Sequence, residues 1–210
     1  MKVHEIFYSI QGESYYAGRP CTFVRLTGCN LRCTYCDTEY AYDEGEEKTV
    51  EAILSAVEQF GCRLVEITGG EPLLQHECPA LIQTLIDRGC TVLVETNGSL
   101  DIRVLPSKAI RIMDIKCPSS GMSERMDLHN LDSLQGKDEV KFVIQDRRDY
   151  EWATRTLNRS EPRHWRVSFS PVHNVLPLKT LAGWILEDRL DVRLQPQLHK
   201  FIWPDVDKGT

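Results

Sequence analysis

The stretch CNLRCTYC at residues 29–36 places three cysteines within eight residues. Thiolates at such spacing bind soft metals and select zinc, copper(I) or iron–sulfur clusters. A structural zinc site usually adds a fourth Cys or His at similarly short spacing, but no such residue follows Cys36 closely. Cys62 lies beyond a predicted helix, and Cys21 begins an apolar strand. A [4Fe–4S] cluster held by only three cysteines would keep one iron free for a small molecule.

The position of the cysteines within the chain supports a ligand site. The three cysteines alone are also compatible with thiols of the hydrophobic core or with a zinc site. However, the apolar run CTFVRLT at residues 21–27 leads directly into Gly28 and the cysteines. The loop is therefore expected at the carboxyl end of a strand, where α/β folds bind their ligands.

The pattern Cys29-x-x-x-Cys33-x-x-Cys36 after an early strand resembles the radical S-adenosylmethionine superfamily. The resemblance implies a [4Fe–4S] cluster on these three cysteines and S-adenosylmethionine bound by its methionine moiety at the open iron. It also implies reductive cleavage of S-adenosylmethionine to a 5′-deoxyadenosyl radical.

Length and composition fit a globular enzyme that acts on a small molecule. The chain has 210 residues, of which 41% are hydrophobic, and a net charge of −6. We expect a single domain over residues 1–210. The negative charge and the lack of a basic run argue against a nucleic-acid partner. The sequence also predicts no signal peptide and no membrane span, so we expect a cytoplasmic protein. In that compartment the other cysteines are expected to be core or incidental thiols.

Short β-rich runs alternate with helical patterns, which indicates repeated strand–helix units around a parallel sheet. Helices are expected in the gaps, and two of them end at Gly61 and Gly89. About six such units are too few for an eightfold barrel. We therefore predict an α/β fold that forms an abbreviated, partial (β/α)6-type barrel, as the resemblance also implies. The predicted strands are residues 21–27, 64–68, 91–96, 110–115, 139–144, 165–169 and 192–194.

A second motif, TGGEP at residues 68–72, follows one of these strands. Paired glycines let a backbone approach a ligand closely, although a tight turn explains an isolated pair equally well. Glu71 offers either a carboxylate near the site or a negative charge at a helix start. In the superfamily this segment contacts the methionine amino group, and Gly70 is the matching position.

The amino-terminal run EIFYSIQGES at residues 5–14 joins a strand-like start to a polar turn. Its Gln and Glu can hydrogen-bond the amide and amine edges of a heterocycle, although the run alone also fits a simple hairpin. With the cysteine loop and Thr38, it closely resembles the 7-carboxy-7-deazaguanine synthases of the 7-deazapurine (queuosine) pathway. Ser14 departs from the second glycine of many relatives. The resemblance continues in DIKCPSSG at 114–121, SPVH at 170–173 and QLHKFIW at 197–203.

The resemblance implies a carbon–nitrogen lyase that converts 6-carboxy-5,6,7,8-tetrahydropterin to 7-carboxy-7-deazaguanine. Ammonia is lost, and the reaction begins when a hydrogen is abstracted from C6 of the substrate. The protein must orient C6, neutralise the substrate carboxylate and exclude solvent. Because the cofactor supplies the difficult chemistry, no catalytic side chain is assigned.

Matching the family segments assigns the binding residues. Arg25 would pair with the substrate carboxylate, unless it makes only a surface ion pair. Thr38 matches the Mg²⁺ position, where a hydroxyl oxygen suits a hard ion. His199 and Lys200 are further anion-binding candidates, unless they are a strand-end histidine and a solvated lysine. The pterin would contact Ile10, Gln11, Gly12, Arg25 and Thr68. S-adenosylmethionine would contact Gly70, Asp114, Ile115, Lys116, Ser170, Pro171, Val172 and His173.

Two other functions fit parts of the pattern. A glycyl-radical-enzyme activase shares the cysteine triad and a GGEP loop, but the QGE turn and the 114–121 segment are not expected in it. A non-enzymatic iron–sulfur electron carrier or a zinc-binding module would use the same cysteines, but neither suits a barrel-sized scaffold. The resemblance further implies an electron donor such as flavodoxin, and a homodimer.

Overall fold

The strands of the computed structural model, which describes residues 1–160, 163–206 and 208–209, form one nine-stranded sheet. The strand order is β3-β1-β2-β4-β5-β6-β7-β8-β9. β1 runs antiparallel to β2 and β3, and all other neighbours are parallel. The strands are β1 (Lys2–Ile10), β2 (Pro20–Leu26), β3 (Glu46–Glu47), β4 (Leu64–Gly69), β5 (Thr91–Thr96), β6 (Ile110–Ile115), β7 (Glu139–Ile144), β8 (Arg166–Pro171) and β9 (Arg193–Leu194).

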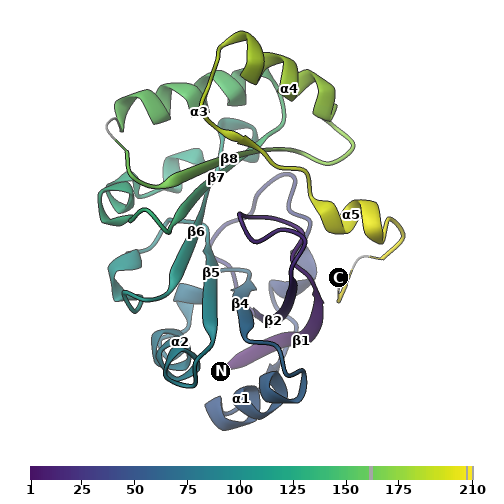
Figure 1. Cartoon of the computed structure of the whole chain (residues 1–210), viewed down its shortest axis with the longest axis vertical. Helices are drawn as coiled ribbons and strands as arrows, with labels where there is room; N and C mark the ends of the chain where they lie inside the picture. Colours follow the sequence, from purple (N-terminus) through teal and green to yellow (C-terminus); the bar gives the residue numbers. More distant parts are fainter. Residues whose placement is uncertain (161–162, 207, 210) are drawn as a thin grey trace.

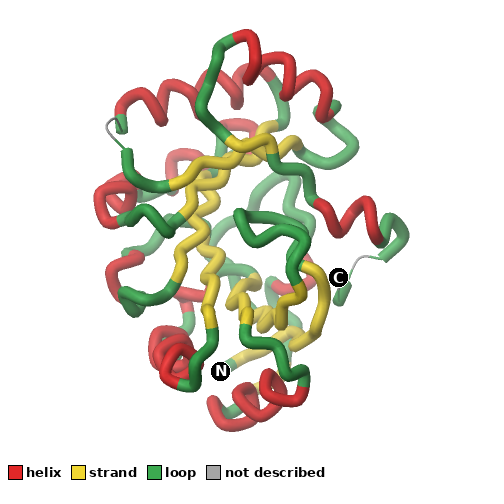
Figure 2. The backbone as a smooth tube through the Cα atoms, viewed as in Figure 1, coloured by secondary structure: helices red, strands yellow, loops and turns green. Residues whose placement is uncertain are grey.

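Helices pack along the outer side of the curved sheet (Figure 1). They are α1 (Val50–Gln59), α2 (Cys78–Asp87), α3 (Arg147–Arg159) and α4 (Leu178–Glu187), and each buries one apolar stripe. The short helix α5 (Leu198–Ile202) lies instead beside the inner side (Figures 1 and 2). None of the helices in the described residues is both long and apolar enough to cross a membrane.

The predicted partial barrel is confirmed, because the sheet is mostly parallel and its edge strands β3 and β9 do not pair. Every predicted strand is present, with ends shifted by at most two residues. The prediction of a helix in each gap was wrong after β5 and β6, where short 3-10 helices form instead. Prolines at Pro106 and Pro118 and the left-handed Gly121 (φ 73°) interrupt regular helix in these segments.

The amino-terminal segment forms a hairpin, because β1 and β2 pair antiparallel. The connection between these two strands also contributes to the inner face of the sheet. Ser14, in this connection, is buried and takes a left-handed backbone conformation with φ 61°. A glycine adopts this conformation without steric cost, whereas a serine is strained in it. Ser14 compensates in part, because its Oγ accepts a hydrogen bond from the Tyr16 amide at 3.1 Å.

We expect Ser14→Ala to lower the free energy of unfolding by about 1 kcal/mol, because it keeps the left-handed strain and loses the hydrogen bond. Ser14→Gly should remain within about 1 kcal/mol of the parent, because relief of strain offsets the lost bond. Urea unfolding monitored by circular dichroism measures both. An alanine variant more stable than the glycine variant would contradict this account of the turn.

Candidate active site

A cavity of about 530 Å³ opens at the carboxyl ends of the parallel strands. Its wall combines strand ends with the β1–β2 connection, the cysteine loop and α5. This volume suits a small-molecule site, and the location is the one at which α/β sheets bind ligands.

The cysteine loop faces this cavity with three half-buried free thiols, those of Cys29, Cys33 and Cys36. The Cys29 Sγ accepts a hydrogen bond from the Leu31 amide at 3.4 Å, and the buried Leu31 side chain anchors the loop. Burial raises the pKa of the Cys33 thiol to about 11, against an opposing effect of Lys116. Iron binding must therefore displace protons from this site.

Gly69 and Gly70 bring the TGGEP turn against the cysteine loop. A Cβ at Gly70 would lie 2.1 Å from the Gly28 carbonyl oxygen and 2.8 Å from the Cys29 Cβ. The Glu71 amide donates to the same Gly28 oxygen at 2.7 Å. The glycine pair thus permits close backbone contact between two loops, and Gly70 also lines the cavity.

The Glu71 carboxylate is fully buried and links three loops. It accepts hydrogen bonds from the Asn97 amide at 2.7 Å, Thr96 Oγ1 at 2.8 Å and the Leu73 amide at 3.0 Å. Asn97 in turn donates from Nδ2 to Asn30 Oδ1 at 3.0 Å. Because Glu71 caps the 3-10 helix Pro72–Leu74, its helix-start interpretation is confirmed.

A buried ammonium, Lys141 of β7, organises the polar wall. Its Nζ lies 2.8 Å from a Glu13 oxygen, 2.5 Å from a Glu95 oxygen and 3.4 Å from Asp114 Oδ2. Burial lowers the pKa of Lys141, but these carboxylates outweigh that effect and hold its pKa well above the usual value. The lysine thus neutralises acids that would otherwise repel one another inside the cavity.

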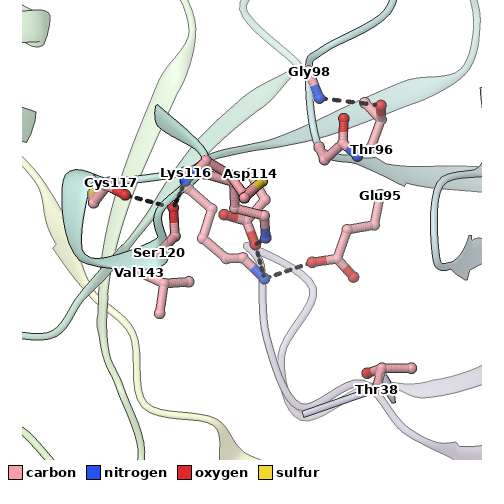
Figure 3. A network of polar contacts seen from close by, with 12 residues as sticks. Thr38, Glu95, Thr96, Gly98, Asp114, Lys116, Cys117, Ser120 and Val143 are labelled. Carbon is pink, nitrogen blue, oxygen red and sulfur yellow. Dashed lines mark hydrogen bonds and ion pairs between the residues drawn. The ribbon is translucent and has the colours of Figure 1, made fainter. Parts of the chain in front are cut away.

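Asp114 and Lys116 form a second buried ion pair beside it, with Nζ 2.8 Å from Asp114 Oδ2. Figure 3 shows Glu95, whose ion-pair partner is Lys141, near Asp114 and Lys116, while Thr38 lies apart on the loop after the cysteines. Burial raises the pKa of Asp114, but Lys116 and Lys141 bring it below its usual value. Asp114 Oδ1 is buried without a hydrogen-bond partner among the described residues, so a ligand donor would satisfy it.

Helix α5 packs directly on the QGE turn. A Cβ at Gly12 would lie 2.1 Å from His199 Nδ1, and the Leu198 amide donates to the Gly12 carbonyl at 2.8 Å. Gln197 Nε2 donates to Glu13 Oε1 at 2.9 Å. His199 lies in this helix, so its interpretation as a strand-end histidine was wrong.

Three side chains predicted to bind the substrate or Mg²⁺ already have partners. Arg25 Nε donates to Glu5 Oε1 at 2.7 Å, and both side chains are mostly buried. Thr68 Oγ1 donates to Glu95 Oε2 at 3.2 Å, and Thr38 Oγ1 donates to an Asp37 oxygen at 3.0 Å. Arg25 itself lines the cavity, and its ion pair with Glu5 is mostly buried and is not a surface contact.

The structure brings most of the predicted residues together. Ile115 does not line the cavity, because its side chain is buried in the outer core. Ser170 and Pro171 are also absent from the wall, and Ser170 Oγ donates to the Gln195 carbonyl at 2.6 Å. The predicted residues in the wall are Ile10, Gln11, Gly12, Arg25, Cys29, Cys33, Cys36, Thr38, Thr68, Gly70, Asp114, Lys116, Val172, His173, His199 and Lys200.

The residues of the cavity wall that were not predicted from the sequence include Glu66, Glu95, Asn97 and Lys141. A signal for three of them was present, because Glu66, Glu95 and Lys141 each interrupt an otherwise apolar strand. A charged side chain inside a buried strand is costly without a partner or a function.

The three thiols suit a multi-iron cluster. Among the described residues, no three Cys, His, Asp or Glu side chains form a group that would hold one metal ion. A [4Fe–4S] cluster does not require such convergence, because each thiolate binds a different iron. The thiols share one short loop and one cavity with further polar groups, as a cluster with an open iron requires.

Comparison with known proteins shows the family to which the chain belongs. The family model of the Radical SAM superfamily matches residues 23–167. A 7-carboxy-7-deazaguanine synthase of Koribacter versatilis (strain Ellin345) is 44% identical over 100% of both chains. One from Chlorobaculum tepidum is 43% identical over 100% of this chain and 97% of its own. QueE from Escherichia coli has the same fold, with a TM-score of 0.73, 22% identity and coverage of 94% of each chain. The chain therefore belongs to the radical S-adenosylmethionine superfamily and, within it, to the family of 7-carboxy-7-deazaguanine synthases.

Proposed function

We propose that this chain converts 6-carboxy-5,6,7,8-tetrahydropterin to 7-carboxy-7-deazaguanine with loss of ammonia. Full-length identity of up to 44% with synthases of that name carries the proposal. The cavity supports it, because the three cysteines and the QGE turn line the same space. A glycyl-radical-enzyme activase and an electron carrier are not favoured, because neither accounts for this full-length match.

When bound, the cluster supplies the electron that cleaves S-adenosylmethionine to the radical that abstracts hydrogen from C6. Substrate and product differ only by the elements of ammonia, so the overall reaction is redox-neutral and a hydrogen must be returned. The polypeptide then has to orient C6, hold the substrate charges and exclude water.

The substrate end of the cavity is assigned to β2, β4 and the QGE turn. Arg25 would neutralise the substrate carboxylate and would give up part of its contact with Glu5 to do so. Thr68 would donate to the substrate from the end of β4, next to Glu95. Ile10, Gln11 and Gly12 would hold the ring through backbone and side-chain groups.

The S-adenosylmethionine end is assigned to Gly70, the run 114–116 and the run 170–173. Asp114 Oδ1, buried and unpartnered among the described residues, would accept a hydrogen bond from the ligand. Ile115, Ser170 and Pro171 do not line the cavity, so they would act by positioning their neighbours Asp114, Lys116 and Val172.

Transfer of deuterium tests this reaction type. Substrate deuterated at C6 should pass deuterium to 5′-deoxyadenosine or recovered S-adenosylmethionine during anaerobic turnover, detected by mass spectrometry. The proposal fails if product forms and neither compound gains deuterium.

We further propose that Thr38 ligates Mg²⁺ together with the substrate carboxylate and water. Its hydroxyl lies in the cavity wall next to Asp37, and oxygen ligands suit Mg²⁺. Thr38→Ala should lose at least half of the rate increase caused by added Mg²⁺ while its iron–sulfur absorbance remains unchanged. Titration of activity with MgCl₂ measures the response, and an unaltered Mg²⁺ response would refute the assignment.

Four further predictions concern the chain as a whole: a single domain over residues 1–210, a homodimer, a flavodoxin-type electron donor and a cytoplasmic location. The single domain is supported by one sheet that contains every described strand. The other three are supported by the family resemblance. Light scattering of the cluster-loaded protein tests the dimer.

A further inference from the structure

One carboxyl group of the cavity wall lies between two buried apolar side chains of the sheet. Glu66 of β4 is 4% exposed and lines the cavity. In the sheet it is flanked by Phe23 of β2 and Leu93 of β5, which are both buried in one apolar cluster. An apolar side chain at this position would extend this cluster without the cost of burying a carboxyl group. The presence of Glu66 therefore indicates a polar partner.

Among the described residues, the hydrogen-bond partner of Glu66 is Gln11, whose Nε2 donates to Glu66 Oε2. The other amide atom of Gln11, Oε1, already accepts the Glu13 amide at 3.0 Å. Gln11 is thus held in place, and Glu66 Oε1 is the atom of this pair that remains for a ligand. Burial raises the pKa of Glu66 well above its usual value, and repulsion from Glu95 and Glu13 raises it further. A ligand that donates hydrogen bonds would stabilise the ionised form.

The sheet register places Glu66 two residues before Thr68, which is the sheet partner of Arg25, the residue assigned to the substrate carboxylate. Arg25 pairs with Thr68, and Phe23 pairs with Glu66. The two pairs are two residues apart, or about 7 Å along the strands. This separation suits a bicyclic ring whose carboxylate faces Arg25 and whose opposite edge faces Glu66.

We propose that Glu66 is a substrate-binding residue that recognises the 2-amino group of the pterin through Oε1, while Gln11 holds Oε2. The inference rests on the proposed function, which supplies the pterin. A buried acceptor of this kind favours a ligand with an amino group and disfavours one with an oxygen at the same position.

Two non-reacting ligands test the contact. Pterin-6-carboxylate and lumazine-6-carboxylate differ in the 2-position, which carries an amino group in the first and an oxygen in the second. Fluorescence titration of unreduced, cluster-loaded protein with S-adenosylmethionine gives both dissociation constants. We expect the parent protein to prefer the pterin by about tenfold or more. Glu66→Leu should lose this preference, and Glu66→Gln should keep part of it because the amide oxygen still accepts.

Glu139→Gln is the matched control, because Glu139 is a buried carboxylate of β7 outside the cavity wall. It accepts from Ser168 Oγ at 2.7 Å and should leave the preference intact. If Glu66→Leu weakens the binding of both ligands by the same factor, Glu66 only positions Gln11 and the inference is overturned. The same holds if Glu66→Leu retains the preference. If the parent protein binds neither ligand, the proposed substrate class fails, and the inference fails with it.

Discussion

Replacing Cys29, Cys33 or Cys36 by alanine should abolish both the iron–sulfur absorbance and all turnover. The three thiols share one short loop and one cavity. Among the described residues no other Cys lines that cavity to take the place of a missing ligand. Anaerobic reconstitution of each variant, followed by iron and sulfide analysis and visible absorption, measures the loss.

Cys62→Ala is the matched control for these variants. The Cys62 thiol lies near the amino ends of β2 and β4, away from the cavity, and is 3.4 Å from both the Pro20 and the Leu64 carbonyl oxygens. It should retain a full complement of iron. Equal loss of the cluster from Cys62→Ala would mean that the ligand set is wrong.

Lys141→Met should lower the free energy of unfolding by about 3–5 kcal/mol, because it leaves buried carboxylates without their counter-ion. Glu13 and Glu95 each contact the Lys141 ammonium directly, and Asp114 lies 3.4 Å from it. The turnover rate should fall as well, since these groups form the cavity wall. Urea unfolding near pH 8 measures the change in stability.

The defect of Lys141→Met should depend on pH. Without the ammonium, burial raises the folded-state pKa of Glu13 above the unfolded value of about 4.3. The loss of folding free energy is then absent below about pH 4. It grows as the pH rises from the unfolded pKa to the folded pKa. Lys108→Met, which removes an exposed lysine, should be nearly neutral at every pH. A Lys141→Met defect that is constant with pH would contradict this role.

The strands were predictable because each is a short run of buried apolar residues bounded by turn residues. Residues 91–96, 110–115 and 139–144 were predicted with the bounds that the structure shows. The connections after β5 and β6 were not, because Leu100 to Ala109 and Cys117 to Asp138 mix apolar residues with prolines and glycines. The edge strand β3 (Glu46–Glu47) has no hydrophobic pattern and depends on pairing with β1.

The site was predictable where the ligands lie in continuous motifs, as in the cysteine loop and the TGGEP turn. The polar wall was not, because Glu13, Glu95 and Lys141 are far apart in the sequence and meet only when the sheet curves. The role of Glu71 also required the structure, since its partners Thr96 and Asn97 follow a different strand. A charged residue within an apolar strand would have indicated Glu66, Glu95 and Lys141 as candidates.

Turnover of the proposed substrate tests the account most directly. Reconstituted, reduced protein would be incubated anaerobically with S-adenosylmethionine, 6-carboxytetrahydropterin and Mg²⁺, and the products analysed by mass spectrometry. The account predicts 7-carboxy-7-deazaguanine in multiple equivalents per protein, formed only when reductant and S-adenosylmethionine are both present. Cluster-loaded protein that releases 5′-deoxyadenosine without this product, or releases neither compound, would contradict it.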